Sequence, residues 1–445
     1  MSDGDRASRS IRSTRFPSAG RFDEPAGLFH FRRPWAPAFP TTGTSMNDIV
    51  LAMRARGIKS SAVRELLEFS KNPDVISLAG GIPASDLFDM DGIDDTLGAI
   101  LRDEHRDLFQ YGLTEGEAGL RQQIGNWAGT LGIPASPESI LITSGSQQGL
   151  DLVARVLFDQ GDRVLVERPT YVAALQVFQF IGARIDGING GPDGLDLDQV
   201  ERELKRGGVK AIYLTPNFAN PTGYTMPLAQ RIRLVELAQR HGCAIIEDDP
   251  YGQLRFSGAA IPSLLSIASQ QPGGNRTVCY LSTLSKVFSP GVRVGWIVPP
   301  AALRPPMAVA KQAFDLHTST LTQNIVARYL ASGRLTSRID VLRTAYRTRR
   351  DALTKALRDA FGNDLSFNEP EGGMFLWCRF ARQVPAEKVL EAAIREKVVF
   401  VPGNAFYASD PERDTLRVSY SMLGEQSAEE AARRLKRAWD AVVRD

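Results

Sequence analysis

One lysine lies between two apolar runs in the stretch "YLSTLSKVFSPGVRVGW", residues 280–296. A lysine beside a buried strand is costly as a cation, so Lys286 is paired, extended to water, or used as a nucleophile with a lowered pKa. Two hydroxyl residues, Thr283 and Ser285, precede this lysine, and Arg293 follows it. Hydroxyls and a guanidinium beside a buried amine are typical of a phosphate site next to a Schiff-base lysine.

Three other polar stretches also follow apolar runs. In "TSGSQQG", a tight turn at Gly145 leads into a helix whose free N–H groups favour an anion, with Ser146 as N-cap or direct donor. In "IIEDDPYG", Asp248 ends an apolar strand, and a buried carboxylate there needs a cationic partner. In "NFANPTG", the residue before proline, Asn220, is held extended with its amide aimed inward. Each stretch alone also fits an ordinary cap or turn.

Together these four stretches supply the parts of one cofactor site. They offer an anion cradle, a carboxylate for a protonated ring nitrogen, an amide donor and a lysine for covalent attachment. A Schiff-base lysine with an acidic partner for the ring nitrogen is the pattern of enzymes that use pyridoxal 5′-phosphate (PLP). The sequence therefore predicts a PLP site.

The elements that must position these residues form an alternating pattern from about residue 139 onward. Strand-like apolar runs alternate with helical patterns, which predicts an α/β fold with a mainly parallel central sheet flanked by helices. The expected strands are "ILIT", "RVLVE", "AIYLTP", "AIIED", "VCYLS" and "GWIV", and the expected helices between them include 147–158, 172–181 and 228–241. Ligands gather at the C-terminal ends of parallel strands, so this edge should carry the site.

Four segments are expected along the chain. Residues 1–45, rich in Arg, Ser, Pro and Gly, are predicted to be a flexible tail; they resemble a transit peptide except for their acidic residues, and Met46 could equally be the start. Residues 46–90 should contribute to the small domain and the active site. Residues 91–335 should form the large PLP-binding domain, and 336–445 a smaller α+β domain entered by one long helix that ends at Gly362.

The composition excludes several classes of protein. Of 445 residues, 43% are hydrophobic and 23% charged, with a net charge of +2, so nothing indicates disorder or attraction to nucleic acid. The chain has no run of about 18 apolar residues and no apolar secretory segment, so we expect a cytoplasmic protein without membrane contact. Three cysteines without a CxxC pair, and four histidines without a pair at ligand spacing, indicate a reducing compartment and no metal.

The order and spacing of eight strings resemble the PLP-dependent class I/II aminotransferases of fold type I. Within them, the chain from Met46 onward is most similar to the 2-aminoadipate and kynurenine aminotransferase branch. The strings are "ISLAGGIP", "FQYGLTEGEAGLR", "ITSGSQQGLDLV", "PNFANPTG", "IIEDDPYG", "STLSKVFSPGVRVGW", "PEGGMFLW" and "LRVSYS".

This resemblance implies a role for each matching residue. The catalytic residues would be Lys286, which bonds covalently to the cofactor and moves protons, Asp248, which pairs with the pyridine nitrogen, and Tyr171, which stacks on the pyridine ring. Asn220 and Tyr251 would hydrogen-bond the phenolic oxygen of the cofactor. The residues that would hold the phosphate are Ser146, Gln147, Thr283 or Ser285, and Arg293.

The resemblance also implies how substrate and a second subunit take part. Arg417 would hold the α-carboxylate of the substrate together with Asn220, and the backbone at Gly81 would close over it. Tyr111 would reach across the interface of a homodimer to the partner's phosphate. The expected reaction moves the amino group of an L-amino acid of 2-aminoadipate, aromatic or branched-chain type to 2-oxoglutarate by a ping-pong mechanism.

Two alternatives stay open at this point. The first is a PLP enzyme of another reaction type, such as a β-lyase, decarboxylase or cyclase, because a fold does not determine a reaction. The second is a transcription regulator, which would need a basic helical module of roughly 65 residues ahead of this region, more than residues 1–45 supply. The donor is also open, because Gly57 stands where relatives that recognise a second carboxylate often have an arginine, with Arg56 one position away.

Overall fold

The computed structural model describes residues 72–102, 106–191 and 194–444, together with Ile49, residues 52–55, Leu66, Glu68 and Phe69. All elements below belong to the unit formed by residues 49–445. The predicted tail, and the two positions Arg56 and Gly57, lie outside the described residues.

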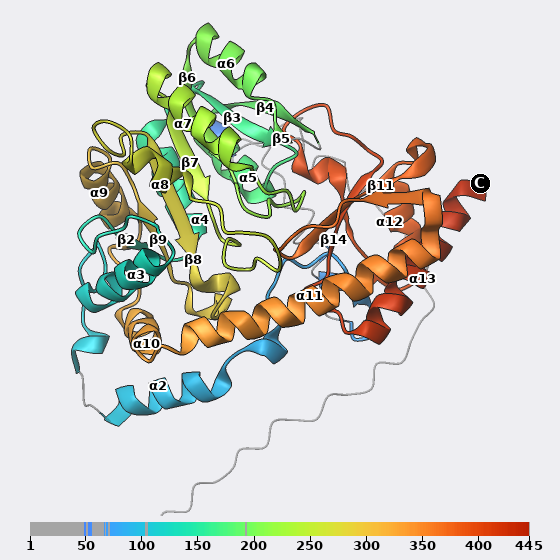
Figure 1. Ribbon diagram of the computed structural model, residues 1–445, viewed down its shortest axis with the longest axis horizontal. Coiled ribbons are helices and arrows are strands. Elements are labelled where there is room, and N and C mark those ends of the chain that lie inside the picture. Colours follow the sequence, from blue (N-terminus) through green and yellow to red (C-terminus); the bar gives the residue numbers. More distant parts are fainter. Residues whose placement is uncertain are drawn as a thin grey trace, which may run out of the picture. The chain divides into compact units, whose positions relative to one another are not determined.

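An eight-stranded sheet forms the centre of this unit (Figure 1). Its strands are β2 (Leu141–Thr143), β3 (Arg163–Arg168), β4 (Arg184–Gly191), β5 (Gly194–Leu195), β6 (Val209–Leu214), β7 (Ala244–Asp248), β8 (Val278–Thr283) and β9 (Gly295–Val298). Their order is β2-β9-β8-β7-β6-β3-β4-β5. The five strands from β8 to β4 pair in parallel, whereas β9 runs antiparallel between β8 and β2, and β5 runs antiparallel to β4. The predicted α/β fold with a mainly parallel sheet is therefore confirmed.

Helices cover both faces of this sheet because alternate strand residues point to opposite sides. In β3, for example, Val164 and Val166 belong to one buried cluster and Leu165 to the other. The first face packs on α4 (Ser146–Leu157), α5 (Val172–Ile181) and α9 (Arg304–Asp315), and the second on α3 (Ala118–Thr130), α6 (Leu197–Arg206), α7 (Leu228–His241) and α8 (Leu264–Ser269).

A second, four-stranded sheet follows in the C-terminal part of the chain. It is antiparallel throughout, in the order β10 (Leu365–Phe367), β11 (Phe375–Phe380), β14 (Thr415–Ser419) and β13 (Val401–Pro402). A short parallel pair joins β1 (Ile76–Ser77) to β12 (Val398–Val399), so residues near the start of the described chain lie beside its C-terminal part. The predicted boundaries of the large and small domains stay predictions.

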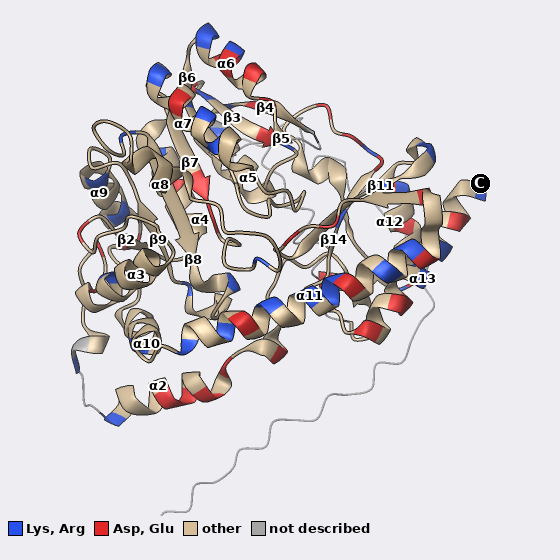
Figure 2. Ribbon diagram, in the orientation of Figure 1, with Lys and Arg blue, Asp and Glu red and all other residues tan. Residues whose placement is uncertain are grey.

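The remaining helices are α2 (Met90–Arg102), α10 (Thr320–Ala331), α11 (Arg334–Phe361), α12 (Ala386–Arg395) and α13 (Glu425–Arg444). α11 is the predicted long helix, and Gly362 at its end has a positive φ of 52°. It packs along α13, and both carry acidic and basic residues, whereas the central strands carry few (Figure 2). In the part of the chain that the structure describes, no helix combines the length and the apolarity needed to cross a membrane.

Candidate active site

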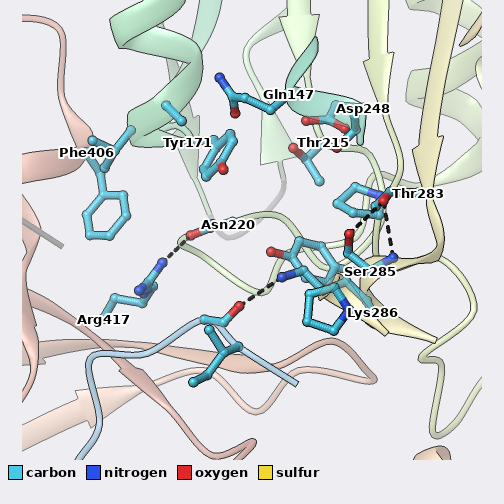
Figure 3. A pocket seen from close by; sticks show the side chains of 18 of the residues that line it. Gln147, Tyr171, Thr215, Asn220, Asp248, Thr283, Ser285, Lys286, Phe406 and Arg417 are labelled. Atoms are coloured by element: carbon cyan, nitrogen blue, oxygen red, sulfur yellow. Dashed lines mark hydrogen bonds between the residues drawn. The ribbon is translucent and has the colours of Figure 1, made fainter. Parts of the chain in front are cut away.

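A cavity of about 300 Å³ lies at the C-terminal ends of the central strands, beside the four-stranded sheet (Figure 3). Every predicted site residue except Tyr111 lines it. Those residues are Gly81, Ser146, Gln147, Tyr171, Asn220, Asp248, Tyr251, Thr283, Ser285, Lys286, Arg293 and Arg417. The residues that follow the central strands meet at one edge of the sheet, and Gly81 from a loop and Arg417 from β14 of the four-stranded sheet line the same cavity.

Lys286 ends a short 3-10 turn, Leu284–Lys286, that follows β8 directly. Its Nζ donates to the Gly81 carbonyl at 2.9 Å, which draws the amine toward the centre of the cavity (Figure 3). Burial, helped by the positive charges of Arg417 and Arg293, lowers the pKa of Lys286 to about 8, against the opposing effect of Asp248. A lysine with such a pKa is a competent nucleophile and proton carrier near neutral pH.

Asp248 is the last residue of β7 and only 4% exposed. Its Oδ2 accepts a hydrogen bond from the Tyr213 hydroxyl at 2.9 Å, whereas its buried Oδ1 has no partner. Burial raises the pKa of Asp248 to about 6; Tyr213 and Lys286 oppose this rise and Asp249 adds to it. The carboxylate is therefore mainly ionised at pH 7, and the free Oδ1 fits the N–H of a protonated pyridine ring.

The predicted anion cradle is a turn between β2 and α4. Gly145 occupies the N-cap position with a φ of 89°, so the prediction of Ser146 as a possible N-cap is wrong, and Ser146 is instead the first residue of the helix. A Cβ on Gly145 would lie 2.4 Å from Arg293 Nη2. That guanidinium donates to the Ser144 carbonyl at 3.1 Å, which holds it over the turn. Helix N–H groups and a guanidinium thus face the same space, which suits a phosphate.

The two hydroxyl residues before Lys286 differ in the group that accepts their hydroxyl proton. Thr283 Oγ1 lies 3.1 Å from the Val294 carbonyl, to which it donates, and also accepts from the Ser285 N–H at 3.2 Å. The two hydroxyl oxygens are 2.9 Å apart. With the proton of Thr283 directed to a backbone carbonyl, the Ser285 hydroxyl is the donor in this 2.9 Å contact. Its proton can turn from this side-chain acceptor to a ligand, which favours Ser285 of the two predicted alternatives.

Arg417, in β14, is 3% exposed and lies across the cavity from Lys286 (Figure 3). Its Nη1 donates to Asn220 Oδ1 at 2.8 Å and its Nη2 to the Ala79 carbonyl at 2.7 Å. The guanidinium lies 4.3 Å from the ring centre of Phe375 and 5.0 Å from that of Phe406. Its buried Nε has no partner, and burial lowers its pKa to about 10. A buried, uncompensated guanidinium is a ready partner for a carboxylate.

A polar network connects two of the loops that carry site residues with strand β8. Asp249 accepts hydrogen bonds from Asn217 Nδ2 at 3.0 Å, from the Tyr280 hydroxyl at 3.2 Å and from the Gly252 N–H at 3.0 Å. Asn217 Oδ1 in turn accepts from the fully buried Arg231 at 2.7 Å. One carboxylate therefore ties together the loops after β6 and β7 and strand β8.

Sequence reasoning assigned no role to this network, nor to several residues around the cavity. Tyr213 is recognisable only as a polar ring in a central strand, and its partner Asp248 lies 35 positions away. The cavity-lining residues that were not predicted are Ile82, Val172, Ala173, Thr215, Pro250, Pro290 and Phe406. Of these, Thr215 had a visible signal, because it follows β6 directly in "YLTPNF".

Two predicted tyrosines lie in different places: one lines the cavity and the other does not. Tyr171 precedes α5 and lines the cavity; burial and the charge of Asp248 raise its pKa to about 12, so its hydroxyl stays protonated. Tyr111 is 79% exposed, and its ring meets the edge of His317 at 5.8 Å between ring centres, away from the cavity of its own chain. Its role stays a prediction. Among the described residues, no group of His, Cys, Asp and Glu side chains could hold a metal ion.

Comparison with known proteins identifies similar chains. Residues 73–435 match the family described as aminotransferase class I and II. A 2-aminoadipate transaminase of Thermus thermophilus is 39% identical over 387 residues, which cover 87% of this chain and 95% of the relative. An aromatic-amino-acid aminotransferase of Thermococcus litoralis is 38% identical, over 86% of this chain and 92% of the relative.

A solved structure of a similar protein has a similar fold. The crystal structure of an alpha-aminoadipate aminotransferase from Thermus thermophilus, complexed with N-(5′-phosphopyridoxyl)-L-leucine, superposes with a TM-score of 0.82 and 38% identity. The match covers 88% of this chain and 98% of that chain. The resemblance inferred from the eight sequence strings is therefore confirmed.

The cradle geometry predicts that Gly145→Ala weakens the binding of PLP. The substitution forces alanine into a positive-φ, extended backbone (φ 89°, ψ 162°) that only glycine adopts readily, and brings its Cβ against the Arg293 guanidinium. The expected loss of affinity is about tenfold or more, because such a backbone alone costs about 1–3 kcal/mol. The dissociation constant of PLP, measured by titration of the apoenzyme, checks this.

A matched control is Gly129→Ala in α3, where a Cβ would meet nothing within 4 Å. This variant should bind PLP as the parent does and should be slightly more stable, because alanine favours a helix over glycine by about 1 kcal/mol. Equal PLP affinity in both variants would contradict the cradle.

Proposed function

Because the chain belongs to the class I and II aminotransferase family and is a PLP-dependent transaminase, we propose that it moves the amino group of an L-amino acid to 2-oxoglutarate. The donor would be of 2-aminoadipate, aromatic or branched-chain type. The observation that carries this proposal is the buried guanidinium of Arg417, which faces the same cavity as the amine of Lys286.

In this proposal, Arg417 and Asn220 hold the α-carboxylate of the substrate. Arg417 already donates to Asn220 Oδ1, so the amide fixes the guanidinium plane and leaves Nε free. A two-pronged bond to a carboxylate fixes direction as well as position, which a lysine ammonium cannot do. The Cα–H bond of the substrate is thereby aimed at Lys286 Nζ.

Lys286 then carries the proton. PLP, when bound, supplies the aldehyde that captures an amino group and a protonated ring that accepts electrons from the substrate. Lys286 Nζ takes the proton from the substrate Cα and returns it during transfer, since its lowered pKa lets it act in both directions near neutral pH. Asp248 Oδ1, which has no partner of its own, would hold the proton on the ring nitrogen, and Asn220 and Tyr251 would hydrogen-bond the phenolic oxygen.

The remaining assignments follow from the lining of the cavity. Tyr171 would stack on the ring. Its hydroxyl group stays protonated and can therefore donate a hydrogen bond. The residues proposed to hold the phosphate are Ser146, Gln147, Ser285 and Arg293, with Thr283 orienting Ser285. The loop at Gly81 lies against Lys286 through its carbonyl, where it can close over a bound substrate.

The described lining also bears on the substrate side chain. Its cations are Lys286, Arg293 and Arg417, each of which already has a role, and its apolar members include Ile82 and Phe406. This set supports aromatic and branched donors, in keeping with the aromatic-amino-acid relative. For a second carboxylate, as in 2-aminoadipate, the described lining offers no further cation.

The experiment that tests the function is a screen of the half-reaction. Each amino acid is added alone to the PLP enzyme, and the visible absorption band is followed together with the appearance of pyridoxamine phosphate. Aromatic and branched amino acids should bleach the band, and 2-oxoglutarate should restore it. Lys286→Ala should slow the appearance of pyridoxamine phosphate by about 10²- to 10⁴-fold, the usual contribution of a proton carrier. Absence of pyridoxamine phosphate with every donor would overturn the proposal.

The pKa of Lys286 leads to a second prediction, on the rate at which the apoenzyme captures PLP. The neutral amine is the nucleophile, so a pKa of about 8 means that the rate rises with pH below 8 and becomes level above it. Stopped-flow mixing of apoenzyme with PLP between pH 6 and 9 measures this. Asp248→Asn removes a charge that raises this pKa, so its profile should shift to lower pH. A rate still rising at pH 9 would contradict the assignment.

We also propose that the protein is a cytoplasmic homodimer in which Tyr111 reaches the phosphate of the partner subunit. The exposed ring of Tyr111, outside the cavity of its own chain, supports this arrangement. Two further large apolar side chains of the same segment, Phe109 and Leu113, are 76% and 60% exposed, as a subunit contact would require. The three cysteines are buried free thiols, which suits a reducing compartment.

Mixing two inactive variants tests the crossing of Tyr111. Tyr111→Ala lacks the phosphate contact and Lys286→Ala lacks the amine, but a mixed dimer would hold one site with both native residues. If Tyr111 serves the partner, the refolded mixture should be clearly more active than the sum of the two variants. If it serves its own chain, every mixed site lacks one residue and activity should not recover. Native mass spectrometry, which resolves the mass difference between the two variants, confirms that mixed dimers form.

A further inference from the structure

The C-terminal end of α9 lies against the turn that carries the anion cradle. Asp315, its last residue, accepts hydrogen bonds through Oδ2 from Gln148 Nε2 at 2.7 Å and from the Ser144 hydroxyl at 3.1 Å. The other carboxylate oxygen forms an ion pair with Lys311 Nζ at 2.6 Å. Asp315 lies outside the cavity lining, so it touches the cradle from behind.

The burial of this ion pair costs desolvation free energy, which a functional role would offset. The side chain of Lys311 is fully buried, and burial lowers its pKa while Asp315 opposes that shift. A buried pair seldom stabilises a fold more than two apolar residues would, although the loss of one partner is costly. The ion pair with Lys311 fixes Asp315 in place, and hydrogen bonds to a carboxylate are stronger than those to a neutral group.

All three polar groups of Ser144 are held. Its N–H donates to Gln148 Oε1 at 2.7 Å, its carbonyl accepts from Arg293 Nη2 at 3.1 Å, and its hydroxyl contacts Asp315. Asp315 also fixes which way the Gln148 amide points, because it accepts from the Nε2 of that amide. The position of Ser144 therefore sets both the start of the Gly145 turn and the place of the Arg293 guanidinium.

We propose that Asp315, held by Lys311, is a positioning residue of the anion cradle: through Ser144 and Gln148 it places Ser146, Gln147 and Arg293 for the phosphate of the cofactor. This inference rests on the proposed role of those three residues. According to this proposal, Asp315 strengthens the binding of the phosphate group and has no effect on the binding of the ring or on the covalent bond to Lys286.

The test compares PLP with pyridoxal, which has the same ring and aldehyde but no phosphate. Lys311→Met keeps the acceptor Asp315, whereas the double variant Lys311→Met/Asp315→Ala removes it without leaving a buried unpaired cation. Relative to Lys311→Met, the double variant should bind PLP about 10-fold or more weakly, because it loses two hydrogen bonds to a charged group. Its affinity for pyridoxal should change less than about twofold. Dissociation constants come from titration of the apoenzymes, followed by absorbance.

Controls separate this inference from the proposed cradle itself. The parent should bind PLP more tightly than pyridoxal, and Arg293→Ala should lose that preference; if the parent has no preference, the proposed phosphate site is wrong. The role of Asp315 is wrong if the parent prefers PLP to pyridoxal and the double variant keeps that preference. It is also wrong if the double variant loses affinity for PLP and for pyridoxal to the same extent. Gln148→Leu, which keeps the ion pair but breaks the contact with Ser144, should show the same selective loss if the double variant does not fold.

Discussion

The site depends on one buried carboxylate with an unused oxygen. Asp248 ends the central strand β7, and its Oδ1 is surrounded by protein without a hydrogen-bond partner. Such a group costs several kcal/mol unless a cation compensates it. The hydroxyl of Tyr213 satisfies the other oxygen and opposes the rise in its pKa, so the carboxylate stays mainly ionised. A protonated ring nitrogen is the partner that this arrangement lacks.

The cations of the cavity are placed in the complementary way. Arg293 and Arg417 line the same cavity as Lys286; together with burial they lower its pKa, whereas Asp248 raises it. A positive charge on the lysine is thus discouraged by the same two residues that would bind the anionic ends of cofactor and substrate. When those anions are bound, this repulsion is neutralised, so the proton affinity of Lys286 should rise as the site fills. The amine is therefore most nucleophilic when it has yet to capture a ligand and more basic when a proton must be moved.

The strands and the residues at their ends could be predicted because both are local. Apolar runs followed by Gly, Pro and Asn identify six of the eight strands of the central sheet, and α5 and α7 have the expected bounds. The two strands that were not predicted, β4 and β5, are rich in glycine, as in "RIDGINGG", and have little apolar periodicity. The supporting contacts were out of reach for a different reason: Asp315 lies 171 positions from Ser144, and only tertiary structure shows that they meet.

The contrast between local features, which the sequence shows, and tertiary contacts, which it does not, also explains why the cavity indicates its cofactor more clearly than its amino-acid donor. In the proposed function, the cofactor would be held by groups at the ends of adjacent strands, whose geometry the sheet fixes. The α-carboxylate would be held by Arg417, whose plane Asn220 and the ring of Phe375 fix from two sides. The described lining also includes the apolar side chains of Ile82 and Phe406, and apolar surfaces discriminate weakly between side chains of similar size. A single arginine that would bind both acids in turn suits the proposed ping-pong reaction, and tolerance for several donors would be its physical consequence.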